Sequence, residues 1–108
     1  MDLHENQFAK FSHKNDMPVV VDFWASWCWP CKAMAPAYAH VSFTMKNQAL
    51  FAKVNTENAQ QLAAQLNIRS IPTLAVFRHG LEVDRIAGAL PVNQLQLWVQ
   101  QALMKIPH

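Results

Sequence analysis

The two cysteines of the sequence stand three positions apart, at Cys28 and Cys31. They lie in the segment Trp27-Cys28-Trp29-Pro30-Cys31, between an apolar run of strand length and a segment of helical composition. Where a strand ends and a helix begins, unpaired N–H groups and the positive end of the helix dipole favour an anion and lower the pKa of a thiol. We therefore predict that Cys28 readily forms a thiolate.

The spacing of this pair favours reversible dithiol chemistry. Positions three apart on a first helical turn share a face, so Cys28 and Cys31 can close and open a disulfide without unfolding the chain. Pro30 suits the first turn, because its missing N–H would have no partner there, and it stiffens the loop. As a structural staple the bridge would be weak, since closing so short a loop stabilises the fold by only about 2 kcal/mol.

A Cys-x-x-Cys pair can also be half of a zinc site, with its other ligands supplied by histidines or by another chain. None of the five histidines has ligand spacing to the pair; they are His4, His13, His40, His79 and His108. We therefore favour redox chemistry and expect no bound metal.

Length and composition fit one small folded domain, residues 1–108. Apolar residues make up 52% of the chain and charged residues 15%, which excludes a disordered chain. A net charge of +2 without charge runs predicts neither a nucleic-acid partner nor a membrane surface. The first eighteen residues hold no apolar stretch of signal-peptide length, and the chain has no wider disulfide framework, so we expect a cytoplasmic location.

Hydrophobic patterning predicts alternating strands and helices. In chain order we expect a helix at 3–14, a strand at 19–25, a helix after Cys31 to about residue 46, a strand at 50–54, a helix at 58–67, strands at 73–78 and 81–87, and a helix at 92–104. The first strand is apolar at nearly every position except Asp22, which is typical of a central strand. Thr56 is expected to cap the helix at 58–67, and Gly80 to allow a tight hairpin turn. The order predicts an α/β fold, a mixed sheet with helices on both faces.

Residues 20–32, Val-Val-Asp-Phe-Trp-Ala-Ser-Trp-Cys-Trp-Pro-Cys-Lys, resemble the active-site segment of the thioredoxins. Other positions match the family's order and spacing, namely Pro36, Lys53, Arg69-Ser70-Ile71-Pro72-Thr73, Gly80 and Gly88-Ala89. Residues 53–57 and 68–73 look most like the bacterial thioredoxin 2 branch, which usually carries an N-terminal zinc ribbon with four further cysteines that this sequence lacks. The resemblance implies the thioredoxin fold. Because the N-terminus is short for the family's first edge strand, we expect four strands rather than five.

The resemblance also implies catalytic roles. Cys28 would be the exposed attacking nucleophile, and Cys31 the buried thiol that resolves the mixed disulfide with a substrate. Asp22 matches the family's buried acid, which takes and returns the proton of Cys31. Its burial should raise the pKa of this carboxyl, and Lys53 on the neighbouring strand should moderate the rise.

Substrate binding is implied at the other side of the cysteines. Ile71-Pro72 resembles the family's cis-proline turn, whose backbone pairs with an extended substrate segment. The residues expected to form the docking surface are Trp27, Trp29, Pro30, Ile71, Gly88 and Ala89. Trp29 stands where the family's usual motif has glycine, and residues between the two cysteines tune the pKa and the redox potential across this superfamily.

The function implied is that of a monomeric protein-disulfide reductase in electron transport and cell redox homeostasis. It would be recharged by an NADPH-dependent thioredoxin reductase and would bind no cofactor, since its redox group is the Cys28–Cys31 disulfide. Two alternatives stay open. Trp29 leaves room for a more oxidising oxidase or isomerase, and the fold could also serve as a binding module in which the cysteine chemistry is incidental.

Overall fold

The computed structural model of the chain describes residues 1–14 and 16–107. Its elements are α1 (Glu5–Lys14), β1 (Val19–Trp24), α2 (Trp29–Thr44), β2 (Leu50–Asn55), α3 (Gln60–Gln65), β3 (Thr73–Arg78), β4 (Leu81–Ala87) and α4 (Val92–Met104). The four strands form one sheet in the order β2-β1-β3-β4. β1 pairs with β2 in parallel, and the other neighbours are antiparallel. The predicted four-stranded mixed sheet is therefore confirmed.

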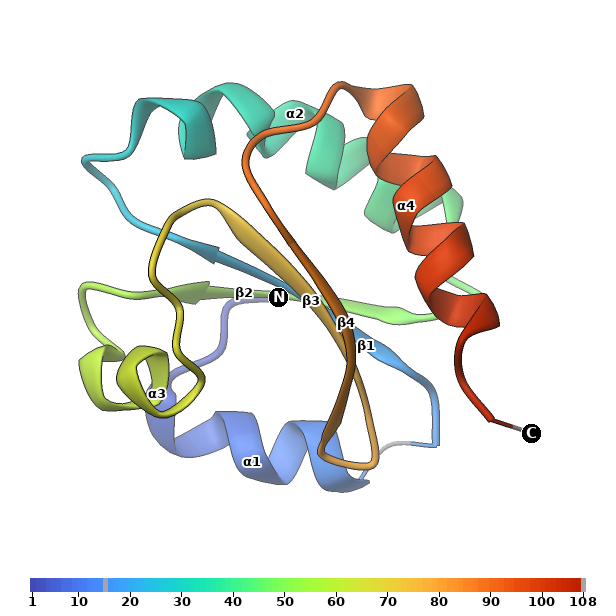
Figure 1. Ribbon diagram of the computed structural model, residues 1–108, viewed down its shortest axis with the longest axis horizontal. Coiled ribbons are helices and arrows are strands. Elements are labelled where there is room, and N and C mark those ends of the chain that lie inside the picture. Colours follow the sequence, from blue (N-terminus) through green and yellow to red (C-terminus); the bar gives the residue numbers. More distant parts are fainter. Residues whose placement is uncertain (15, 108) are drawn as a thin grey trace.

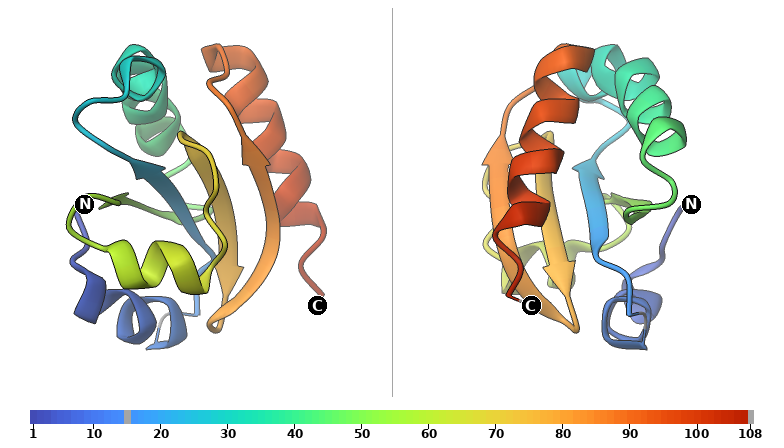
Figure 2. Two further views of the ribbon diagram at one scale, coloured as in Figure 1. Left: turned by 60° about the vertical axis from the view of Figure 1, so that its left-hand side comes forward. Right: turned by 90° about the vertical axis from the view of Figure 1, so that its right-hand side faces the viewer.

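Helices cover both faces of the sheet, as predicted (Figure 1). α1 and α3 lie against one face, and α2 and α4 against the other (Figure 2). The alternation of side chains along β1 explains why two cores form: Val19, Val21 and Phe23 belong to the cluster under α1 and α3, whereas Val20 belongs to the cluster under α2 and α4. A strand that is apolar on both faces can only be an interior strand, which is the position that β1 takes.

The helix α4 packs on the sheet through one apolar face, whose residues recur at three- and four-residue spacing. Leu95, Val99 and Ala102 have no exposed surface, and Trp98 packs partly buried beside them. On α2, the buried Tyr38 hydroxyl lies within hydrogen-bond distance of two backbone carbonyl oxygens of the sheet, those of Val20 at 3.1 Å and Ala52 at 2.7 Å. This contact ties α2, which begins at the cysteines, to β1 and β2.

The N-terminal residues pair with the outer edge of β2. The N–H of Leu3 donates to the carbonyl of Lys53 at 2.8 Å, and the N–H of Lys53 donates to the carbonyl of Met1 at 2.7 Å. Asp2 and Lys53 form an isolated parallel bridge. The prediction that the first helix begins at residue 3 is therefore wrong, because the backbone of Leu3 is taken by this pairing and α1 starts at Glu5.

The predicted cap at Thr56 is also wrong. α3 is shorter than expected, and its N-cap residue is Ala59, which makes no side-chain cap. The hydroxyl of Thr56 instead donates to the carbonyl of Trp24 at 3.0 Å, and the Thr56 N–H donates to the same oxygen at 2.8 Å. The Thr56 hydroxyl therefore bonds to the carbonyl of the last residue of β1 rather than to the helix that the sequence pattern predicted it would cap.

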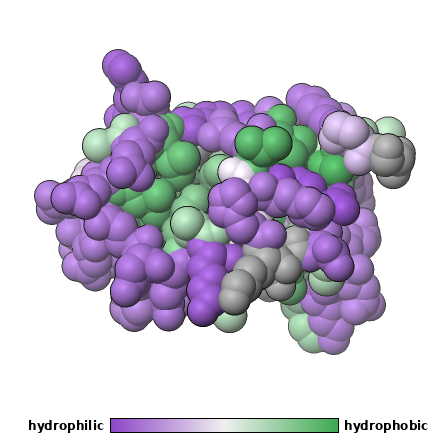
Figure 3. Space-filling model, turned by 90° about the horizontal axis from the view of Figure 1, so that it is seen from below, coloured by the Kyte–Doolittle hydropathy of each residue, from purple (hydrophilic) through white to green (hydrophobic). Residues whose placement is uncertain are grey.

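The outer surface on the side of α1 and α3 is mostly hydrophilic (Figure 3). A groove between these helices has Phe8, Ala9 and Leu62 among its otherwise polar lining. None of the helices among the described residues is both long and apolar enough to cross a membrane.

Substitution of Gly80 by alanine should destabilise the protein by about 1–2 kcal/mol. Gly80 sits in the β3–β4 turn at φ +80°, which an L side chain rarely adopts, and an added Cβ would also meet the imidazole of His13. Urea unfolding measures the loss, and His13→Ala in the same background should recover the part that is due to the clash. Equal stability of Gly80→Ala and the unsubstituted protein would contradict the role given to this turn.

Candidate active site

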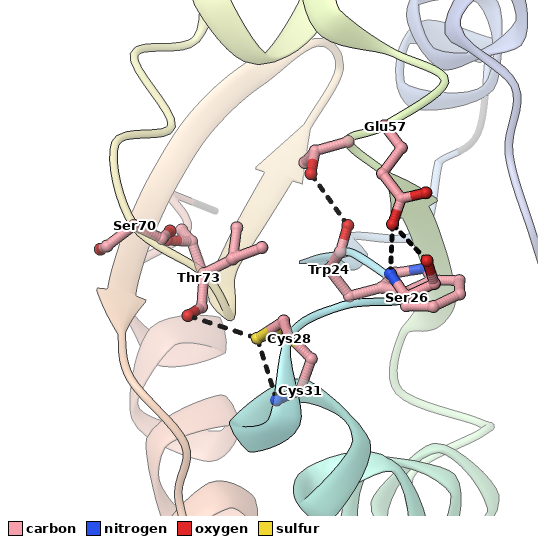
Figure 4. The surroundings of a disulfide bond; sticks show 9 residues. Trp24, Ser26, Cys28, Cys31, Glu57, Ser70 and Thr73 are labelled. Carbon is pink, nitrogen blue, oxygen red and sulfur yellow. Dashed lines mark hydrogen bonds between the residues drawn. A yellow bond between two sulfur atoms is a disulfide. The ribbon is translucent and has the colours of Figure 1, made fainter.

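The two cysteines lie where β1 gives way to α2, and they are joined in a disulfide (Figure 4). Cys28 is the N-cap residue of α2, and its sulfur accepts a hydrogen bond from the N–H of Cys31 at 3.2 Å. Pro30 lies in the first turn, as predicted. The Cα atoms of the two cysteines are 5.3 Å apart, within the normal range for a disulfide. The Cys28 sulfur therefore stands at the positive end of a sixteen-residue helix, where a thiolate is stabilised.

Both cysteines are buried, with 3% of their surface exposed. The expectation that Cys28 is exposed is therefore wrong for this disulfide-bonded form. Its sulfur lies 3.7 Å from the carbonyl oxygen of Ile71, and the side chains of Ile71 and Trp24 pack against the pair. Trp24 is close to the cysteines in sequence, whereas Ile71 is 43 residues away from Cys28, so the local motif alone does not indicate its contact.

Asp22 is buried in β1 with 1% of its surface exposed. Neither of its carboxylate oxygens has a hydrogen-bond partner among the described residues. Burial raises the pKa of Asp22 from 3.8 to about 6, and the positive charge of Lys53 partly opposes the rise. Lys53 is the register partner of Asp22 on β2, and its ammonium also lies 4.9 Å from the centre of the Trp24 ring. A carboxyl with such a pKa exchanges a proton readily near neutral pH.

Facing the cysteines is the loop that enters β3. The Ile71–Pro72 peptide bond is cis, as the resemblance implied. The loop is held by two hydrogen bonds: the Thr73 hydroxyl donates to the carbonyl of Ser70 at 2.6 Å, and the N–H of Gly88 donates to the carbonyl of Pro72 at 2.8 Å. Gly88 therefore lies beside the cis-proline loop, although it is far from it in sequence.

Most of the residues predicted to form the docking surface are exposed, and we call this set the exposed rim. Trp27 is 73% exposed and Trp29 is 75% exposed, while Ile71 is half-buried. Pro30, Gly88 and Ala89 are also exposed. Trp27 and Ile71 share a groove of about 300 Å³, which is lined by Trp27, Thr56, Ile68, Arg69, Ser70 and Ile71. Trp29 does not line this groove.

Sequence reasoning missed one contact of the site, between Ser26 and Glu57. The backbone N–H and the hydroxyl of Ser26 both donate to Oε1 of Glu57, at 2.6 and 2.5 Å (Figure 4). The available signal was positional: Ser26 and Glu57 each follow the end of one of two paired parallel strands, so both lie at the same edge of the sheet.

The described residues include no group of three or more His, Cys, Asp or Glu side chains that could hold a metal ion. His108 lies outside the described residues. The redox group that the site itself contains is the Cys28–Cys31 disulfide.

Comparison with known proteins agrees with this geometry. The family model "Thioredoxin" matches residues 1–101. The chain is 44% identical over 105 residues to Thioredoxin C-3 of Corynebacterium nephridii, covering 97% of this chain and 72% of that protein. It is 42% identical over 89 residues to Thioredoxin 1 of a Nostoc species, covering 82% of this chain and 83% of that protein. It is also 38% identical over 94 residues to the chloroplastic M-type thioredoxin of Spinacia oleracea, covering 87% of this chain and 52% of that protein.

The fold, the pair of sulfurs at a helix N-terminus and these likenesses agree with one another. A thiolate at such a position exchanges with a substrate disulfide, and the second cysteine three residues away closes the cycle. The chain therefore belongs to the thioredoxin family, and it is a thiol–disulfide oxidoreductase that reduces protein disulfides through Cys28 and Cys31.

Proposed function

We propose that the reaction begins at Cys28, and the observation that carries this assignment is the position of its sulfur at the N-terminus of α2. In the reduced protein the Cys28 thiolate attacks one sulfur of a substrate disulfide. A bond forms between Cys28 and that sulfur, the substrate disulfide breaks, and the other substrate sulfur leaves as a thiolate that takes up a proton. The product is a mixed disulfide between the chain and its substrate.

In the second step Cys31 resolves this intermediate. Asp22 accepts the thiol proton of Cys31, and the resulting thiolate attacks the Cys28 sulfur. The Cys28–Cys31 disulfide forms, the bond to the substrate breaks, and the second substrate thiolate leaves and is protonated. The pKa of Asp22, near 6, supports the assignment, because such a carboxylate is a stronger base than an exposed aspartate and is still ionised at neutral pH. Lys53 keeps this pKa from rising further.

The substrate would dock as an extended segment along the cis-proline loop, beside the Ile71 carbonyl that faces the Cys28 sulfur. The exposed rim described above would supply the apolar contact, above all through the exposed indoles of Trp27 and Trp29, which precede and follow Cys28 in the sequence. Large exposed aromatic side chains at a reactive centre are typical of protein-binding surfaces. These placements support a substrate that is a protein rather than a small thiol compound.

In the cell the chain would act in electron transport and redox homeostasis, as one domain of 108 residues and as a monomer. An NADPH-dependent thioredoxin reductase would return electrons to the Cys28–Cys31 disulfide. Cytoplasmic location is part of the proposal, and the likeness to a chloroplastic protein of spinach means that the family itself does not fix the compartment. The closer kinship with the thioredoxin 2 branch likewise stays a prediction.

The reduction potential tests the direction of electron flow. We expect a value close to the roughly −270 mV already known for thioredoxin, measured by equilibration with dithiol buffers and alkylation of the free thiols. A potential about 60 mV or more above that value favours the oxidation of other proteins by roughly 3 kcal/mol, and would replace the reductase by an oxidase or isomerase. The Trp29→Gly variant, measured alongside, reports how much the indole between the cysteines contributes to the potential.

A further inference from the structure

The loop that leads from β1 to the disulfide is held by the loop that follows β2. The parallel pairing of these strands ends at Trp24 and Asn55, and further backbone and side-chain hydrogen bonds join the two loops beyond that point. The N–H and hydroxyl of Thr56 donate to the carbonyl of Trp24, at 2.8 and 3.0 Å. The N–H and hydroxyl of Ser26 donate to Oε1 of Glu57, at 2.6 and 2.5 Å (Figure 4). The active-site loop is thus hydrogen-bonded to the loop after β2, beyond the end of the sheet.

The surroundings of Glu57 favour the negative charge of its carboxylate. Hydrogen bonds from the hydroxyl and N–H of Ser26, then from the N–H of Trp27, and the attraction of Lys32 lower the pKa of Glu57. Its own N–H donates to Oδ1 of Asn55 at 2.9 Å, which fixes its backbone. One carboxylate therefore holds Ser26, the second residue before the first cysteine, and attracts the N–H of Trp27 that follows it.

We propose that Glu57 is a positioning residue for protein substrates: by holding Ser26, it keeps the indole of the adjoining Trp27 at the rim where a protein disulfide docks. The inference rests on the proposed mode of substrate docking. Trp27 is 73% exposed, so side-chain packing holds only a small part of the indole and the position of its backbone decides where it stands in the groove that it shares with Ile71. A small disulfide that meets only the sulfurs does not depend on this indole, whereas a protein does.

The test compares two substrates in Glu57→Gln and Ser26→Ala. Reduction of insulin reports on a protein disulfide, and reduction of 5,5′-dithiobis(2-nitrobenzoic acid) by the reduced protein reports on the sulfurs alone. We expect kcat/KM for insulin to fall about fivefold, mainly through a higher KM, and the rate with the small disulfide to change less than about twofold. Matched controls are Asp16→Asn, an exposed carboxylate before β1, and Ser42→Ala, whose hydroxyl bonds within α2.

Two outcomes would overturn the inference, provided that the variants unfold cooperatively like the unsubstituted protein. The first is an equal loss with both substrates, which would place the effect of Glu57 on the sulfurs or on the fold. The second is unchanged insulin reduction in both variants. A third result would concern the unsubstituted protein. If it reduces the small disulfide but not insulin, the proposed docking of protein substrates is wrong, whatever the role of Glu57.

Discussion

Substitution of Cys28 by serine is expected to abolish the reduction of protein disulfides, lowering kcat/KM by at least about a thousandfold. The hydroxyl that replaces the thiol is not ionised at neutral pH even at the N-terminus of α2, so no nucleophile remains to attack a substrate disulfide. Cys31→Ser should behave differently. It keeps the nucleophile but removes the resolving thiol, so a mixed disulfide with the substrate should accumulate to about one equivalent and be visible by mass spectrometry of the intact adduct.

The same pair of variants separates an enzyme from a binding module. The adduct of Cys31→Ser should disappear on addition of dithiothreitol, and it should not form in the double variant Cys28→Ser, Cys31→Ser. Partner binding that survives in Cys28→Ser with unchanged cellular function would show that the cysteine chemistry is incidental. An adduct carried by Cys31 in the Cys28→Ser variant would reverse the roles assigned to the two sulfurs.

Substitution of Asp22 by asparagine should stabilise the protein at neutral pH while slowing its catalysis. Above pH 6 the folded protein holds a buried charge, and the rise of the pKa from 3.8 to about 6 corresponds to about 3 kcal/mol. Between about pH 4 and pH 6 the folded state keeps a proton that the unfolded state has lost, so stability falls as the pH rises. Below that window both states are protonated and the penalty is absent. Urea unfolding of both proteins at pH 3 and pH 7 measures the difference.

The catalytic half of this prediction has its own readout. The rate at which Cys31 resolves a mixed disulfide should fall about tenfold or more at pH 7 in Asp22→Asn, and the inflection near pH 6 should vanish from its pH profile. Lys53→Gln should move that inflection upward, because the charge that opposes the rise is removed. Asp16→Asn, at an exposed position, serves as the control. If Asp22→Asn gains stability but the pH profile of its resolution rate is unchanged, Asp22 takes no part in proton transfer.

The sheet could be predicted well because its signals are local. β1 is apolar on both faces, and this alone places it in the interior of the sheet. The β3–β4 hairpin follows from His79-Gly80, both of which take positive φ. The helix ends were predicted less well. Threonine is common at helix N-caps, yet the hydroxyl of Thr56 donates its hydrogen bond to the carbonyl of Trp24, 32 residues earlier. The N-cap preference of a residue type does not tell whether its side chain will bond to the adjacent helix or to a backbone group of another strand.

The candidate site divides in the same way. The cysteine pair, the acid in β1 and the cis-proline loop are recognisable from motifs, and the structure has the disulfide and the cis bond. Burial of Cys28 was not predictable, since the covering carbonyl belongs to Ile71, 43 residues away. The contact between Ser26 and Glu57 depends on the register of β1 against β2, which the amino-acid pattern of either strand leaves open.

The pairing of the first three residues with β2 also bears on how the molecule avoids aggregation. The unpaired N–H and C=O groups of an edge strand can bond to a strand of another molecule, and repeated pairing of this kind leads to aggregation. Here the carbonyl of Phe51 accepts from the amino group of Met1, and the N–H and carbonyl of Lys53 are taken by residues 1 and 3. At the opposite edge, β4 carries Glu82, Asp84 and Arg85, and the register of its pairing with β3 shifts at residues 76–77. Both borders of the sheet are thus poor templates for a further strand, one because it is already covered and the other because it is charged and irregular.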